Sequence, residues 1–510
     1  MQNNQTQTSR SVGRNVLYGF STWVLPLVLG FIATPRIVRA LGEHDYGIYS
    51  LVLGIVGYSF NFSFGRAVTK YIAEYRANNE NEKIADIISA AFFINLVVGL
   101  SCVFIIYLSA EWLVQNVFNI DAEAQSKTVS ALFISAWIIF LWMQNQIFSS
   151  ILQGIHRFDV YSKIFNLNNF ALLVGNLFLA VGGYGILSLF AWNLTLALIT
   201  CFVYAFAARR YLSEFKIKLN FRRSSMKLIV LYSAGVIGYQ ILSNFLLLFE
   251  RGLITRDLGA NTLTHYVVPM GLAIYIHSFI ASVVIVIFPL ASELKNEPEK
   301  LLRLYTKATK IVCLFVFFLG TSMIVESRVF LTLWMGADFA LGTTNLLIIH
   351  TVTFSFVAIQ IVSWQMTEGL GYPNYNCYLF VICLIISVFL MLYLPPVFGL
   401  DGFALGRMFG YLTIFFSIFY VEKWFFGAVQ TSLWMKILLV LSTASVVSAI
   451  VQKTIINYLQ IGWLSFLTAG ILGGGVYALI VWILGFISDE EKLLFRRLFL
   501  PRIKQDEKGF

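Results

Sequence analysis

The residues of this sequence that could do chemistry are charged side chains inside long apolar stretches. Arg407 lies in the stretch GFALGRMFG. A charge near the centre of a bilayer costs about 2.5–3.5 kcal/mol on insertion scales, so this group needs a partner, water or a bound anion. Two interpretations of Arg407 stay open: a cavity cation that binds an anionic substrate, or one half of an internal ion pair.

Glu250 and Arg251 are adjacent in a second apolar stretch, FLLLFERGL. Neighbours on a helix point about 100° apart, so we expect each side chain to find its partner elsewhere. Arg251 is a further candidate for the substrate cavity. Glu250 and the histidine of a later apolar stretch, His277, are candidates for ion coupling. A structural salt bridge and a packed neutral histidine are the alternatives.

Arg66 and Lys70 lie one helical turn apart, with Glu74 a further turn along. Two cations at this spacing could bind an anionic group at the inner membrane surface. The alternative is that they snorkel to the interface and that Lys70 pairs with Glu74. Arg39 and Arg256 fall at the predicted outer ends of apolar stretches and could accompany substrate release, or they could be surface residues.

Gln144 and Gln360 lie inside apolar stretches, at corresponding places of the internal repeat described below. They could line a polar substrate cavity, or they could form hydrogen bonds between helices. The sequence contains no Gly-rich phosphate loop ending in GK[ST], no HExxH and no acidic cluster with metal-ligand spacing. We therefore expect a transporter rather than an enzyme, with no cofactor, no metal site and no nucleic-acid partner.

The composition indicates a membrane protein. Of the 510 residues, 58% are hydrophobic and 12% are charged, whereas a soluble domain has roughly 25% charged residues. Strand alternation is absent, so the sequence predicts an all-α polytopic membrane protein with about fourteen transmembrane helices. The candidate spans are 15–38, 47–69, 85–108, 128–152, 161–181, 185–207, 228–256, 264–290, 308–326, 343–366, 374–394, 400–421, 434–451 and 461–487.

Lysine and arginine predict the orientation of these spans. If the N-terminus is cytoplasmic, most of the 36 basic residues fall in inside loops, as the positive-inside rule requires. An even number of spans then places both termini in the cytoplasm. The net charge of +10 is expected to reflect this orientation.

An internal repeat organises the chain. RALGEHDYGIY at 39–49 returns as RDLGANTLTHY at 256–266, and the identical pairs include Gly42 with Gly259 and Tyr49 with Tyr266. A unit of about 200 residues that occurs twice in the same orientation predicts two parallel six-helix lobes plus two C-terminal helices. The predicted domains are a cytoplasmic tail (1–14), the N-lobe (15–210), a basic linker (211–227), the C-lobe (228–425), spans thirteen and fourteen (426–487) and a basic amphipathic tail (488–510).

The motifs LGEHDYGIYSLVLGIVGY at 41–58, FGRAVTKYIAEY at 64–75, QGIHRFDVYSKI at 153–164 and LFERGLITRDLGANTLTHY at 248–266 resemble those of O-antigen (Wzx-type) flippases. These belong to the polysaccharide-exporting branch of the MATE-like MOP superfamily. The resemblance implies export of an undecaprenyl-diphosphate-linked oligosaccharide across the bacterial inner membrane, without a cofactor. It also implies membrane lipids as partners, and a polysaccharide polymerase or other export protein as a candidate partner.

Other functions stay open. The lipid II flippases of the superfamily carry cavity-facing arginines in the first span, but here that span is uncharged from Asn15 to Pro35. A multidrug or small-molecule exporter of the MATE type is a second alternative. A membrane glycosyltransferase or polymerase is a third, although the large outer loop such enzymes need is absent from the predicted topology.

Overall fold

The computed structural model describes residues 28–55, 64–218, 222–284, 287, 290–291, 294–459 and 461–487. These residues form helices and no strand, which confirms the predicted all-α class. The predicted N-terminal tail, the start of the first span and the C-terminal tail lie outside them. Besides a helical segment at 28–55, the elements are α2 (Phe64–Ala77), α3 (Asn81–Trp112), η1 (Leu113–Val117), α4 (Ala122–Gly154), α5 (Phe158–Val181), α6 (Gly185–Tyr211), α7 (Arg223–Val284), α9 (Pro298–Trp334), α10 (Ala337–Ile359), α11 (Ile361–Gly369), α12 (Pro373–Tyr393), α13 (Pro395–Phe398), α14 (Leu400–Leu412), η2 (Thr413–Phe415), α15 (Phe416–Phe425), α16 (Thr431–Tyr458) and α17 (Trp463–Ile483).

Eleven helical stretches of the described residues are long and apolar enough to cross a membrane. They correspond in order to twelve of the fourteen predicted spans, because one stretch, Gln240–Ser282, covers both the seventh and the eighth. The first two predicted spans lie partly outside the described residues. The count of fourteen therefore stays a prediction, as do the boundaries of the two lobes.

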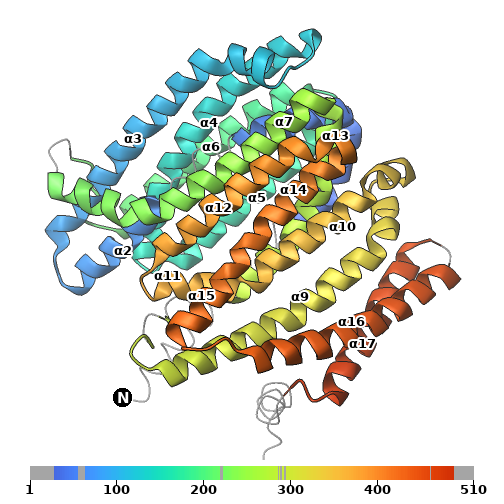
Figure 1. Cartoon of the computed structure of the whole chain (residues 1–510). Helices are drawn as coiled ribbons and strands as arrows, with labels where there is room; N and C mark the ends of the chain where they lie inside the picture. Colours follow the sequence, from blue (N-terminus) through green and yellow to red (C-terminus); the bar gives the residue numbers. More distant parts are fainter. Residues whose placement is uncertain are drawn as a thin grey trace, which may run out of the picture. The chain divides into compact units, whose positions relative to one another are not determined.

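The chain divides into two compact units, which are described separately here. The first unit contains residues 1–275 and 367–417, and the second contains 276–366 and 418–510. In the first unit, α4 packs against α2, α3 and α6, and α12 packs against α14 (Figure 1). In the second unit, α9 packs against α10, α16 and α17 (Figure 1).

Glycine allows close helix packing in the first unit. A Cβ added to Gly65 on α2 would lie 2.3 Å from Ser150 Oγ on α4, and one added to Gly154 would lie 3.0 Å from the Thr69 carbonyl oxygen. The Thr69 hydroxyl donates a hydrogen bond to the Ser150 carbonyl at 3.1 Å. The contact between α2 and α4 thus depends on small residues, as is common between membrane helices.

Two glycines break the helical runs at corresponding points of the repeat. Gly42 has φ +78° within 28–55, and Gly259 has φ +84° within α7. L side chains rarely adopt this left-handed conformation, so glycine is needed at both turns. The two turns also meet closely, since a Cβ on Gly47 would lie 1.9 Å from the Ala260 carbonyl oxygen.

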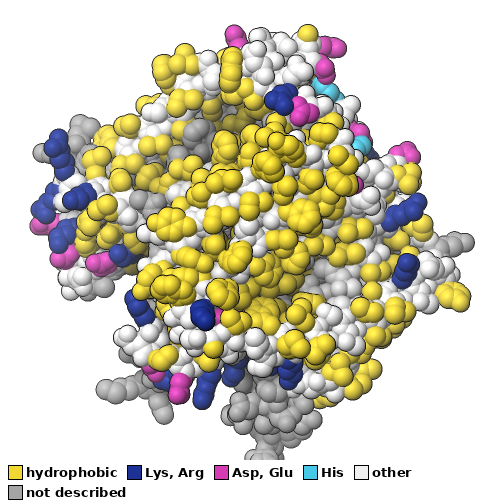
Figure 2. All heavy atoms as spheres, in the orientation of Figure 1, with side chains coloured by type: hydrophobic (Ala, Val, Ile, Leu, Met, Phe, Trp, Pro, Cys, Tyr) yellow, Lys and Arg dark blue, Asp and Glu magenta, His cyan; other side chains and the backbone are white. Residues whose placement is uncertain are grey.

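Apolar side chains cover much of the surface along the helices. Phe104 on α3, Phe178 on α5 and Phe206 on α6 are more than 60% exposed. Figure 2 shows hydrophobic side chains along the helices and charged side chains gathered towards the helix ends. Such extensive apolar exposure fits lipid contact rather than water.

Candidate functional site

A buried ionic centre lies between α7 and α14 in the first unit. Arg407 and Glu250 have no exposed surface. Arg407 Nε donates to Glu250 Oε1 at 3.0 Å, and Arg407 Nη2 pairs with Glu250 Oε2. The Tyr266 hydroxyl, also on α7, donates to the same carboxylate. The structure thus shows the internal ion pair that was one of the two interpretations of Arg407, and it identifies the partner of Glu250.

Arg251 points away from this pair, as expected for a helical neighbour of Glu250. It is 7% exposed, and its guanidinium donates to the Ser50 carbonyl. Gly54 makes room for it, because a Cβ there would lie 2.7 Å from Arg251 Nη1. Arg251 therefore joins α7 to the helical segment 28–55, and any contact between this side chain and a substrate stays a prediction.

A cavity surrounds the two predicted anion-binding residues of α2, Arg66 and Lys70. Its volume is about 460 Å³, within the range of small-molecule sites. Both cations are exposed. The rest of the lining is polar, aromatic or glycine and comes from α2, α4, α5 and α7: Gly65, Thr69, Gln146, Ser149, Ser150, Gln153, Tyr161 and Tyr232.

Aromatic rings hold Lys70 in this cavity. Its Nζ lies 4.6 Å from the centroid of Tyr71 and 4.9 Å from that of Tyr232, within cation–π distance. Its predicted i,i+4 partner, Glu74, is 4.0 Å away. An exposed pair at this distance contributes at most about 1 kcal/mol, so Lys70 can turn to an anionic ligand at little cost.

The cavity and the ionic centre lie on the same helix. Tyr232 lines the cavity and Glu250 belongs to the ionic centre, eighteen residues further along α7. At 1.5 Å per residue this separation is about 27 Å, close to the thickness of the hydrocarbon core. The predicted loading site and the buried pair are thus about five helical turns apart on α7.

The remaining predicted residues are spread over both units. Gln144 is 3% exposed on α4, and its side-chain atoms have no hydrogen-bond partner among the described residues. In the second unit, Gln360 lies at the break between α10 and α11, and His277 is half-buried on α7. Arg39 and Arg256 are exposed, and Arg256 pairs with Asp257 at 2.7 Å.

The turn after α4, in the motif QGIHRFDVYSKI, is held by one cation. Arg157 donates to Asp159 at 2.9 and 3.0 Å and lies 3.9 Å from the centroid of the Tyr211 ring on α6. The hydrogen bond with the Asp159 carboxylate raises the pKa of the Arg157 guanidinium. Arg157 is therefore fixed as a structural cation.

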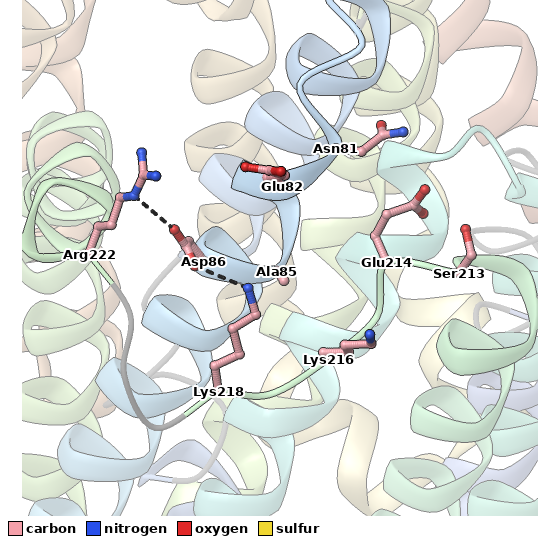
Figure 3. A pocket seen from close by; sticks show the side chains of 9 residues that line it. All are labelled: Asn81, Glu82, Ala85, Asp86, Ser213, Glu214, Lys216, Lys218 and Arg222. Carbon is pink, nitrogen blue, oxygen red and sulfur yellow. Dashed lines mark ion pairs between the residues drawn. The ribbon is translucent and has the colours of Figure 1, made fainter.

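A second polar pocket lies where the basic linker meets α3, and its volume is about 730 Å³. Figure 3 shows Lys218 and Arg222 reaching Asp86 from two directions, at 3.8 and 3.4 Å. The Ser89 hydroxyl accepts from the Lys218 amide at 2.8 Å. Asp86 was not predicted as a site residue, although an acidic residue inside the predicted span 85–108 was the available signal.

Sequence reasoning also missed three buried ionisable residues of the second unit: Glu326, His350 and Glu422. Glu326 and Glu422 fall at or beyond the ends of predicted spans, where acidic side chains normally reach water. His350 lies inside the predicted span 343–366, and the signal there was a histidine in an apolar stretch.

The long apolar helices, the buried ionic pair and the polar cavity define a multi-pass membrane protein with the architecture of a transporter. A family model described as "Polysaccharide biosynthesis protein" matches residues 12–295, which is more than half of the chain. The chain therefore belongs to this family, and the resemblance to the polysaccharide-exporting branch of the MOP superfamily is confirmed. A putative O-antigen transporter of Shigella flexneri is 22% identical over 409 residues, covering 78% of this chain and 94% of the relative.

Solved structures confirm the fold. An inward-facing multidrug resistance MATE transporter of the MOP superfamily has a TM-score of 0.70 at 14% identity, covering 80% of this chain and 98% of its own. The lipid II flippase MurJ in an inward closed conformation has a TM-score of 0.69 at 17% identity, covering 95% of this chain and 100% of its own. These characterised proteins are transporters and a flippase rather than enzymes, as predicted for this chain.

Proposed function

We propose that this protein is a flippase that moves an undecaprenyl-diphosphate-linked oligosaccharide from the inner to the outer leaflet of the bacterial inner membrane by alternating access. Membership of a polysaccharide biosynthesis family supports a glycan substrate. The observation that carries the proposal is the cavity in which Arg66 and Lys70 stand among polar and tyrosine side chains.

The chemistry of this cavity fits the headgroup. A diphosphate carries roughly two negative charges, and charge-assisted hydrogen bonds from guanidinium and ammonium groups are about twice as strong as neutral ones. Gln146 and Gln153 offer donors and acceptors to sugar hydroxyls, and the Tyr161 and Tyr232 rings offer apolar faces. The lipid tail needs no polar site, because it can remain in the bilayer.

In this mechanism the headgroup loads at the cytoplasmic end of α7, where both chain termini are also proposed to lie. Gln144, Gln360 and Arg251 are the candidates to contact it during passage, and Arg39 and Arg256 are the candidates to accompany its release. Arg407 stays paired with Glu250 at rest, and it contacts the diphosphate only if transport opens that pair. Glu250 and His277 remain the candidates for ion coupling.

The test is flipping of a purified undecaprenyl-diphosphate-linked oligosaccharide in proteoliposomes. A charged hydrogen bond contributes about 1.5–3 kcal/mol, so Arg66→Ala and Lys70→Ala should each lower the apparent substrate affinity by roughly ten- to a hundred-fold. Arg76→Ala is the matched control, because Arg76 is an exposed cation of the same helix that does not line the cavity.

Equal effects of all three substitutions would show that only the surface potential matters and would contradict the cavity assignment. Export of a cationic dye with no flipping of the lipid-linked glycan would replace the proposal with a MATE-type exporter.

A further inference from the structure

The two buried glutamates of the second unit have opposite surroundings. Glu422 on α15 accepts three hydrogen bonds of 2.7 Å, from the Tyr305 hydroxyl, the Trp434 indole nitrogen and the Gln430 amide. Three donors are thus aimed at one carboxyl group. Glu422 therefore has a complete hydrogen-bond site around it.

Glu326 on α9 has no such site. It is 3% exposed, and its carboxyl group has no hydrogen-bond or ion-pair partner among the described residues. Its helix packs against α10, α16 and α17 (Figure 1). A Cβ added to Gly470 on α17 would lie 3.7 Å from Glu326 Oε1 and 4.0 Å from Oε2, so the carboxyl group lies directly beside α17.

The carboxyl group also lies below the membrane surface. Gly470 is seven residues from the start of α17 at Trp463, which places it about 10 Å along the helix. The whole of α17 has 21 residues, about the length needed to cross the hydrocarbon core. Glu326 is therefore at a depth where an unpaired charge is unfavourable.

A second buried polar group near Glu326 also has an oxygen atom that accepts no hydrogen bond among the described residues. Gln452 on α16 is fully buried, and its amide nitrogen donates to Ser322 Oγ at 2.9 Å and to Ser448 Oγ at 3.1 Å. Its oxygen, Oε1, has no donor among the described residues. Ser322 is one turn from Glu326 on α9. Among the described residues, the junction of α9, α16 and α17 thus contains two buried acceptor oxygens that accept no hydrogen bond.

No described cation compensates the Glu326 carboxyl group. On its own helix Arg328 is exposed, and on α16 Lys453 is exposed. The ionisable group of α10 at this level is the buried His350, which forms no ion pair with Glu326 in the structure. The α17 sequence offers only Tyr477, whose hydroxyl donates to the Leu314 carbonyl at 2.9 Å.

We propose that Glu326 is a proton-binding site at this junction. The carboxylate takes up one proton and becomes a neutral acid, which supplies the missing donor and removes the uncompensated charge. The proton is resident at neutral pH and allows α16 and α17 to pack against α9. Loss of the proton would require water or a cation to enter between the three helices. This assignment does not depend on the transported substrate.

The test is infrared difference spectroscopy of the full-length protein in lipid nanodiscs at neutral pH. The carbonyl stretch of a protonated carboxylic acid is distinct from the carboxylate bands. We expect this acid band in the wild type, its loss in Glu326→Gln and its retention in Glu422→Gln. The second variant is the matched control, because it neutralises a buried glutamate that has three donors.

Each outcome decides the assignment. An acid band that is absent from the wild type, or that persists in Glu326→Gln, overturns the proposal. Glutamine mimics the neutral acid, so failure of Glu326→Gln to accumulate as a folded protein would also overturn it. Sodium added at constant pH should leave the band unchanged, and loss of the band on adding sodium would show a metal-cation site instead.

Discussion

Breaking the pair between Glu250 and Arg407 should destabilise the protein strongly. Both side chains are fully buried, and removing one partner of a buried pair typically costs about 3–5 kcal/mol, since the other charge is left uncompensated. In Arg407→Met, the Tyr266 hydroxyl would be the one donor to Glu250 left among the described residues. We expect the ratio of folded to unfolded protein to fall by between about a hundred and several thousand fold.

Removing both charges should restore most of this loss. Apolar or neutral replacements of a whole buried pair are often tolerated, so Glu250→Gln combined with Arg407→Met should be more stable than Arg407→Met alone. The measurement is reversible unfolding of the four members of this double-mutant cycle in detergent. Arg256→Met is the control, because Arg256 pairs with Asp257 on the exposed end of the same helix as Glu250 and should cost no more than about 1 kcal/mol.

The reasoning would be refuted if Arg407→Met cost no more than Arg256→Met, or if the two single changes were additive. Flipping by the stable double variant then separates the two roles of the arginine. Normal transport would show that Arg407 has only a structural role. Loss of transport in a stable protein would show that its charge acts on the substrate. Arg407→Lys should then recover part of the activity.

Three further outcomes follow from the structure. Gly259→Ala places a side chain at φ +84° and should cost about 1–2 kcal/mol in unfolding experiments, whereas Gly271→Ala, in the same helix with open space around it, should be neutral or slightly stabilising. Gln144→Leu removes a buried polar group without a partner among the described residues, so it should raise the midpoint of thermal unfolding. Slower flipping in the same variant would support contact between Gln144 and the glycan, and unchanged flipping would contradict it. Flipping of the diphosphate-linked substrate should need no proton or sodium gradient. It should speed up at an inside-negative potential, which contributes up to about 4.6 kcal/mol per 100 mV for two charges. Transport that does not depend on voltage and stops when the proton gradient collapses would contradict this driving force.

The apolar spans could be predicted because hydropathy reports directly on the solvent of each segment. The helix ends could not. The predicted span 308–326 lies inside α9, which runs from Pro298 to Trp334. Lysine, arginine and glutamate are good helix formers, so the helix continues through residues that the hydropathy pattern excludes.

The candidate site was predictable only in part. Helix geometry predicts that Glu250 and Arg251 have different partners. It does not predict that the partner of Glu250 is Arg407, 157 residues away, because this depends on which helices become neighbours. Arg66 and Lys70 could be identified from their spacing, whereas the cavity around them needs residues from four helices. Glu326 could not be predicted as a buried group, because it is α16 and α17 that cover it.

The part of α7 before its break at Gly259 has a mechanical consequence. From Arg223 to Leu258 the helix runs without a break, which is about 54 Å of rigid rod. Tyr232, which lines the cavity, lies about 27 Å along this helix from Glu250 in the ionic centre. We consider a tilt of the helix about Glu250. A tilt of one degree therefore displaces the Tyr232 ring by about 0.5 Å, and a tilt of ten degrees displaces it by nearly 5 Å. A small rotation about the buried pair would therefore move Tyr232, which lines the cavity around Arg66 and Lys70, by several ångströms.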